Sequence, residues 1–72
     1  MTKTEEIILD ALNESPNKTA AWTALLKKSG VTERGFRTVT RRMMDERMIV
    51  RSDLHGSEIS LTLHGLRMLR RA

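Results

Sequence analysis

Apolar residues recur at helical spacing in the first part of the chain. Ile8, Leu9, Ala11 and Leu12 supply an apolar face for a first helix of about three turns, and Thr2 with Glu5 has capping-box spacing. Ser15-Pro16 ends this helix, because the residue before a proline avoids helical angles. Thr19 is then expected to cap a second helix, in which Trp22, Leu25 and Leu26 form an i, i+3, i+4 stripe that predicts core positions.

A third predicted helix, 32–46, has two faces of opposite character. Its apolar stripe at i, i+3, i+4 and i+7 is Phe36, Val39, Thr40 and Met43, and between these fall Arg34, Arg37, Thr38, Arg41 and Arg42. Thr32 is a good N-cap, and Gly30 can close the preceding helix in the left-handed conformation. Two helices joined by a short glycine turn, with a basic outer face, indicate a helix-turn-helix arrangement. A solvated surface is the alternative interpretation of the same basic face.

The period changes after the third helix. Met48–Ser52 and Glu58–Leu61 are short β-prone runs around a five-residue loop with a glycine, which predicts a hairpin over 48–61. Thr62 is expected to cap a last helix whose inward line is Leu63, Leu66 and Leu69. The pattern therefore predicts one mainly α domain over 1–72, with three helices, a two-stranded β-hairpin and a C-terminal helix.

Charge is distributed unevenly along the 72 residues, whose formal net charge is +4. Residues 1–31 balance four lysines against four acidic residues, whereas 32–72 carry nine arginines and five acidic residues. Arginine binds phosphate and guanine edges in a bidentate way that lysine cannot, so a polyanion is expected to face the second half.

Several kinds of chemistry are not expected from this composition. There is no cysteine, the only histidines are His55 and His64, and no nucleophile or phosphate-loop motif occurs. We therefore expect no enzyme, no metal, no cofactor and no small-molecule ligand. No apolar run reaches membrane-spanning length, so we expect no membrane partner and a cytoplasmic, nucleoid-associated location.

Together, the order of elements and several residues resemble the winged helix-turn-helix family across nearly the whole chain. The matching residues are Leu25, Leu26, Gly30-Val31-Thr32, Phe36, Met43, Met48-Ile49-Val50 and Leu61-Thr62-x-x-Gly65. The chain departs from the family at Arg47, where many members have a glycine after the recognition helix. The resemblance implies that 32–46 enters the DNA major groove and that 48–61 is the wing.

Residue by residue, the resemblance also implies a DNA-binding set. It comprises Thr32, Glu33, Arg34, Arg37, Thr38, Arg41, Arg42, Lys27, Lys28, Arg51 and His55. Arg37 and Thr38 are expected to read base edges, while Arg41, Arg42 and Lys27 or Lys28 hold phosphates. Arg51 and His55 would reach an adjacent minor groove or backbone, the alternative being a solvated loop.

The sequence thus predicts specific binding to double-stranded DNA, in transcriptional regulation of a small prokaryotic, plasmid or viral type. The alternatives are a protein-interaction or assembly module and the DNA-binding terminal domain of a larger replication or partition protein. A homodimer is also expected, because one such domain reads few base pairs. Ile7, Leu9 and Met68 are expected to lie off the inward stripes and to pair two copies, unless they only widen the core.

Overall fold

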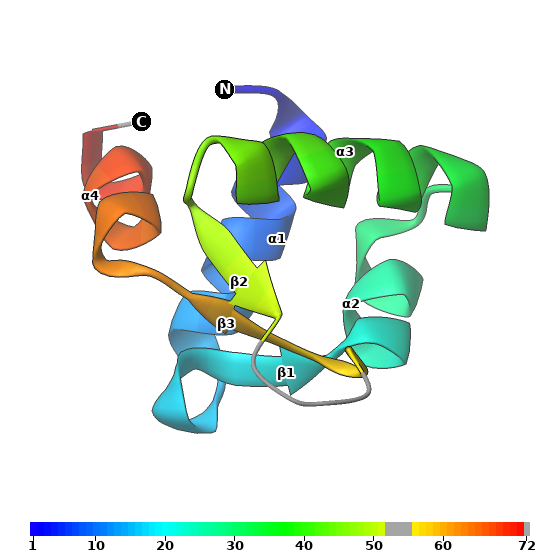
Figure 1. Cartoon of the computed structure of the whole chain (residues 1–72), viewed down its shortest axis with the longest axis horizontal. Helices are drawn as coiled ribbons and strands as arrows, with labels where there is room; N and C mark the ends of the chain where they lie inside the picture. The colour runs from blue at the N-terminus through cyan, green and yellow to red at the C-terminus, as the bar shows by residue number, and fades with distance from the viewer. Residues whose placement is uncertain (52–55, 72) are drawn as a thin grey trace.

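The computed structural model describes residues 1–51 and 56–71, most of which are helical. The helices are α1 (Lys3–Glu14), α2 (Trp22–Ser29), α3 (Glu33–Asp45) and α4 (Leu63–Arg71), and the strands are β1 (Thr19–Ala21), β2 (Ile49–Arg51) and β3 (Glu58–Leu61). A short 3-10 turn (Pro16–Lys18) links α1 to β1. The predicted class, mainly α with a small antiparallel sheet, is confirmed; Figure 1 shows α3 lying across one side of the molecule, with α2 and α4 at opposite ends.

Three threonine hydroxyls cap helices where the sequence predicts caps. The Thr2 hydroxyl accepts from the Glu5 backbone N–H at 3.2 Å, and the Glu5 carboxylate accepts from the Thr2 backbone N–H at 3.0 Å, which completes a capping box. The Thr32 hydroxyl accepts from the Gly35 N–H at 3.1 Å, and the Thr62 hydroxyl accepts from the Gly65 N–H at 2.9 Å. The starts of α1, α3 and α4 are therefore fixed by local hydrogen bonds.

Left-handed backbone angles end two of the helices. Gly30 follows α2 with φ 71°, as the glycine turn predicts, and the chain then enters α3 two residues after Val31. Arg47 follows α3 with φ 61°, so a residue with a side chain occupies the conformation that glycine adopts at least cost. This turn directs the chain from α3 into β2.

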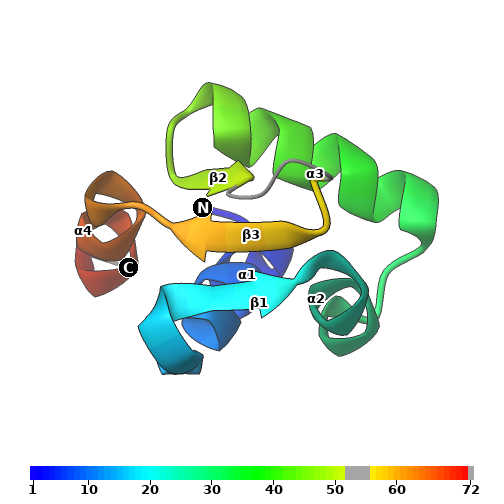
Figure 2. The same cartoon turned by 60° about the horizontal axis from the view of Figure 1, so that its bottom comes forward.

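The sheet has three strands in the order β1-β3-β2, both pairs antiparallel (Figure 2). The pairing of β2 with β3 confirms the predicted hairpin, but the predicted two-stranded sheet is incomplete. Thr19 was expected to cap the second helix, and this prediction is wrong: Thr19 lies in β1 opposite Ser60, with their hydroxyl oxygens 2.8 Å apart. The second helix begins at Trp22 without a side-chain cap, because the residues before it are drawn into the sheet.

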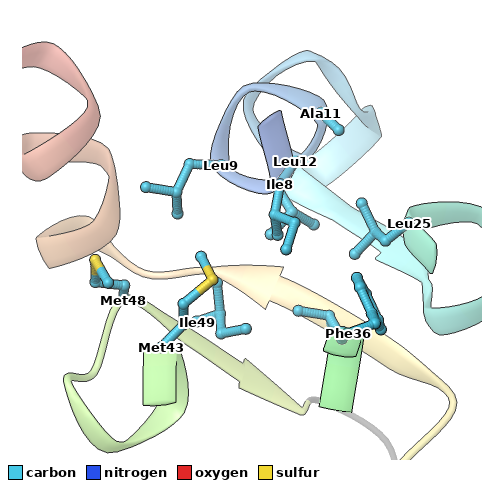
Figure 3. Packing of buried hydrophobic residues seen from close by; sticks show 10 residues of the cluster. Ile8, Leu9, Ala11, Leu12, Leu25, Phe36, Met43, Met48 and Ile49 are labelled. Carbon is cyan, nitrogen blue, oxygen red and sulfur yellow. The ribbon is translucent and has the colours of Figure 1, made fainter. Parts of the chain in front are cut away.

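The core is formed by residues of α1, α2, α3, β2 and β3 and of the turn before β2 (Figure 3). Its buried residues are Ile8, Leu9, Ala11, Leu12, Leu25, Phe36, Met43, Met48, Ile49 and Ile59. Two predictions about the outer faces are wrong. Leu9 is fully buried, so it is not available to pair two copies, whereas Ile7 and Met68 are both half-buried and their part in pairing stays a prediction. Leu63, predicted to face inward, is 64% exposed, because α4 turns its Gly65 side towards the body of the protein.

Gly65 is the point at which α4 comes closest to the rest of the fold. It is buried, and a Cβ added there would clash with the backbone carbonyl oxygen of Met48. That carbonyl oxygen accepts from the Thr62 backbone N–H at 3.1 Å, and the Thr62 hydroxyl has two acceptors within reach, the Arg47 carbonyl at 2.6 Å and the Met48 carbonyl at 3.0 Å. The close approach holds the start of α4 against the turn that joins α3 to β2.

Candidate nucleic-acid interface

The outer face of α3 is polar and cationic along its whole length. Its exposed residues, together with the cap that precedes it, include Thr32, Glu33, Arg34, Arg37, Thr38, Arg41 and Arg42, all of which the sequence assigns to the site. The opposite face is anchored by Phe36, Thr40 and Met43, each fully buried. The Thr40 hydroxyl is satisfied inside its own helix, since it donates to the Phe36 carbonyl at 2.8 Å. The buried face therefore fixes which side chains α3 presents to solvent.

Arg37 is held by an ion pair at the start of this face. Its Nη2 lies 3.0 Å from the Glu33 Oε1, one helical turn away, and the two side chains are 69% and 61% exposed. Such an exposed i, i+4 pair contributes only about 0.3–0.5 kcal/mol. The ion pair mainly orients the Arg37 side chain. It holds one guanidinium nitrogen towards the N-terminal end of α3, and the remaining N–H groups can donate to a ligand.

Thr38 lies beside Arg34 and Arg41 on the outermost line of the helix. Its hydroxyl donates to the Arg34 carbonyl at 3.1 Å, so the hydroxyl hydrogen is used within the helix. The hydroxyl oxygen can still accept a hydrogen bond, and its methyl group can make an apolar contact such as one to a thymine methyl. Among the described residues, Arg34 and Arg41 take part in no ion pair.

The structure brings Arg51 of β2 to the side of α3. The Arg51 Cζ lies 4.4 Å from the centroid of the Trp22 ring, within cation–π range. The Trp22 ring in turn meets Phe36 of α3 edge-to-face, with centroids 4.6 Å apart and planes at 77°. Arg37, Arg41 and Arg51 all line one groove there. Three predicted site residues from two elements thus converge.

Arg42 lies on the other flank of α3. Its Nε is 3.9 Å from the Glu46 carboxylate, and it lines a pocket of about 110 Å³ with Glu5, Glu46, His64 and three methionines. Burial raises the pKa of the Glu5 carboxyl, but the Thr2 hydrogen bonds and the charge of Arg42 outweigh burial and hold that pKa below its ordinary value. Part of the Arg42 charge is therefore already compensated, and its predicted phosphate contact stays a prediction.

The remaining predicted site residues are less closely placed. Lys27 and Lys28 are exposed in the last turn of α2, next to the Gly30 turn that leads into α3. His55 lies outside the described residues. His64, which is not among the predicted site residues, is exposed in the first turn of α4.

Trp22 is the residue of this surface that the sequence did not assign to it. Its spacing predicts a core position, and the ring does pack against the core. Its contact with Arg51 joins residues 29 positions apart, and no periodic pattern reports such a contact. The only related signal in the sequence is the presence of an arginine at the end of the first β-prone run.

No protein-family model and no curated protein matches the chain. Within 1–51 and 56–71, no group of three or more histidine, cysteine or acidic side chains is placed to hold a metal ion. Over the same residues, no helix has both the length and the apolar character needed to cross a membrane.

Proposed function

We propose that the chain is a winged helix-turn-helix domain that binds specific double-stranded DNA, with α3 as recognition helix and the β2–β3 hairpin as wing. The observation that carries this proposal is the continuous cationic surface formed by the outer face of α3 and Arg51 of β2. The left-handed Gly30 between α2 and α3 supports the helix-turn-helix part. A sheet of three short strands beside the helices is compatible with the wing.

The length and the side chains of α3 suit the DNA major groove. Its 13 residues span roughly 20 Å, and an α-helix with its side chains fits a groove that is about 12 Å wide. Arg37 and Thr38 would read base edges, because bidentate arginine recognises guanine and a threonine methyl can meet thymine. Arg41, Arg42 and Lys27 or Lys28 would hold phosphates, which position the protein without reading sequence.

The competing proposal is a protein-interaction or assembly module, and the exposed apolar residues help to weigh it. Within the described residues, the large exposed apolar side chains are Met1, Val50 and Leu63. None of them lies on α3, whose outer face carries arginine and threonine instead. An interaction surface on α3 would be expected to show an apolar patch, so the composition of this face favours DNA.

Transcriptional regulation is the process proposed for this DNA binding, in a cytoplasmic, nucleoid-associated location where DNA is accessible. The alternative is that the chain forms the DNA-binding part of a larger replication or partition protein. We further propose that two copies act together, because one recognition helix reads too few base pairs for selectivity in a genome. Of the side chains that the sequence suggested for pairing, Leu9 is fully buried, and Ile7 and Met68 are half-buried.

Selection of bound duplexes from a random DNA pool tests the proposal. The unsubstituted chain should enrich a defined sequence, and a homodimer should enrich one with two-fold symmetry bound by two chains. Arg37→Ala should lose about 1–3 kcal/mol on the selected site and bind related sites with less discrimination, whereas Arg41→Ala should weaken all duplexes alike. Arg70→Ala, the same charge change at the α4 end of the molecule, is the matched control.

Two outcomes would contradict parts of this proposal. If Arg37→Ala and Arg41→Ala give equal losses on every duplex, the division into base and phosphate contacts is wrong. If no sequence is enriched and no duplex is bound at low salt, DNA binding itself is wrong.

A further inference from the structure

A groove of about 400 Å³ lies between α3 and the first strand of the hairpin. Its exposed lining residues are Arg37, Arg41 and Arg51, and its more buried lining residues are Trp22, Thr40 and Met44. Among the described residues that line it there is no carboxylate. Arg37 is paired with Glu33 at 3.0 Å, whereas Arg41 and Arg51 take part in no ion pair among the described residues, so their positive charges would attract an anion placed at this groove.

Arg51 is held in place at this groove by its neighbours. Its guanidinium lies over the Trp22 ring, 4.4 Å from the centroid, and its Nη1 is 3.1 Å from where a Cβ on Gly56 would stand. Gly56 has φ 67°, so both its backbone angle and the space beside Arg51 favour glycine. The guanidinium is thus positioned by packing rather than by an acidic partner within the described residues.

Trp22 is itself tied to three parts of the fold. Its ring meets Phe36 of α3, and its backbone N–H donates to the Ser57 carbonyl, just before β3, at 2.8 Å. The third tie is the cation–π contact to Arg51 of β2. Trp22 therefore contacts both α3 and the two chain segments at the base of the hairpin, and it helps to hold the hairpin beside α3.

Stacking and hydrogen bonding use different parts of a guanidinium group. The Arg51 Cζ lies 4.4 Å from the centroid of the Trp22 ring, and the N–H donors of a guanidinium lie at the edge of its plane. An arginine stacked in this way can donate to a phosphate without leaving the ring, and it loses less side-chain freedom on binding because its position is already set.

We propose that this groove binds one phosphate group of the DNA backbone between α3 and the wing, and that Trp22 is the positioning residue that holds Arg51 there. The inference rests on the proposed DNA binding and adds a specific consequence to it. Removal of Trp22, which carries no charge, should reduce the number of phosphates that the protein neutralises.

The salt dependence of duplex binding measures that number directly. Each phosphate contact contributes about 0.9 to the slope of log affinity against log salt. Arg51→Ala should flatten the slope by about one unit, and Trp22→Leu should flatten it by the same amount. The Trp22→Leu/Arg51→Ala double variant should match Arg51→Ala alone, because the two residues act through one contact. Trp22→Phe, which keeps an aromatic ring for the stack, should retain the full slope.

Leu26→Ala provides the matched control for a merely structural effect. Leu26 is also a half-buried α2 residue that packs on the core, but it does not line the groove. Its substitution should lower the melting temperature and leave the salt slope unchanged. All titrations are made at a temperature at which circular dichroism shows each variant folded.

Tryptophan emission gives a second measurement in the unsubstituted chain, since Trp22 is its only tryptophan. Duplex binding should change the emission of Trp22, and Arg51→Ala should abolish most of that change. If Trp22→Leu does not fold, this emission measurement tests the inference in its place. A full salt slope in Trp22→Leu, an equal flattening in Leu26→Ala, or an unchanged emission would overturn the inference while duplex binding stands. Absence of duplex binding by the unsubstituted chain would instead overturn the proposed function, and the inference with it.

Discussion

Replacement of Gly65 by alanine tests how α4 is docked on the fold. In an isolated helix this change would be favourable by about 1 kcal/mol, because alanine has the higher helix propensity. Here the added Cβ would clash with the Met48 carbonyl oxygen, which is backbone and cannot rotate away. Either α4 or the turn before β2 must shift.

The size of the effect follows from what that shift breaks. Overpacking costs about 1–3 kcal/mol. Displacement of the Met48 carbonyl also weakens its hydrogen bond from the Thr62 backbone N–H, worth about 0.5–1.5 kcal/mol, whereas the Thr62 hydroxyl keeps the nearer Arg47 carbonyl at 2.6 Å as an acceptor. These two costs, less the gain in helix propensity, predict that Gly65→Ala loses about 1–3 kcal/mol of unfolding free energy. For a domain of this size that lowers Tm by roughly 5–25 °C.

Thermal unfolding followed by far-ultraviolet circular dichroism measures the change. His64→Ala, on the exposed neighbouring position, is the control and should raise Tm slightly through helix propensity. A Gly65→Ala variant that melts at or above the unsubstituted chain would show that α4 is not packed against the Met48 carbonyl as described.

Two further predictions concern charged residues. Glu5 has a pKa below its ordinary value in the folded chain, so its contribution to stability is full above the ordinary value of about 4.5 and is lost as the pH falls through the lower folded value. When Tm is measured at decreasing pH, Glu5→Gln should therefore lose less stability than the unsubstituted chain. Glu6→Gln is the control for an exposed position. A Glu5→Gln variant whose Tm falls with pH as steeply as that of the unsubstituted chain would contradict this. Glu33→Gln removes a carboxylate from the proposed DNA face, and should raise affinity for all duplexes roughly two- to fivefold at low salt. It should also lower the discrimination between DNA sequences, because Arg37 loses the carboxylate that orients it. Competition titrations with selected and unrelated duplexes measure both effects. A loss of affinity for unrelated duplexes would contradict the proposal that the outer face of α3 faces DNA.

Local signals in the sequence predicted much of the helical structure. The caps at Thr2, Thr32 and Thr62, the end of α1 before Pro16 and the glycine turn at Gly30 each depend on residues within one turn of one another. The buried face of α3 was also predicted, because the helical spacing of its apolar residues identifies the side that packs on the core.

The errors come from contacts between residues that are distant in the chain. Thr19 is a good helix cap by type, but pairing with Ser60, 41 positions later, draws it into a strand instead. On α4, the glycine at 65 sets the inward face through its approach to Met48, and this turns Leu63 outward against the apolar pattern.

For the candidate site, the sequence predicted the exposed face of α3 but not how its arginines are grouped. The separation of Arg42, beside Glu46 and Glu5, from Arg37 and Arg41 follows from which neighbours flank α3 on each side. The position of Arg51 depends on the register of β2 against β3 and on the ring of Trp22. Both are properties of the assembled fold.

The most direct test of the proposed function is the salt dependence of duplex binding by the unsubstituted chain. Neutralisation of about four to six phosphates predicts a slope of log affinity against log salt of about −4 to −5. Removal of two charges from the outer face of α3, in an Arg37→Ala/Arg41→Ala variant, should flatten that slope by as much as two units if both side chains lie on phosphates, and by about one unit if Arg37 reads bases. Absence of duplex binding at low salt, or a slope that this double substitution leaves unchanged, would contradict DNA binding through α3.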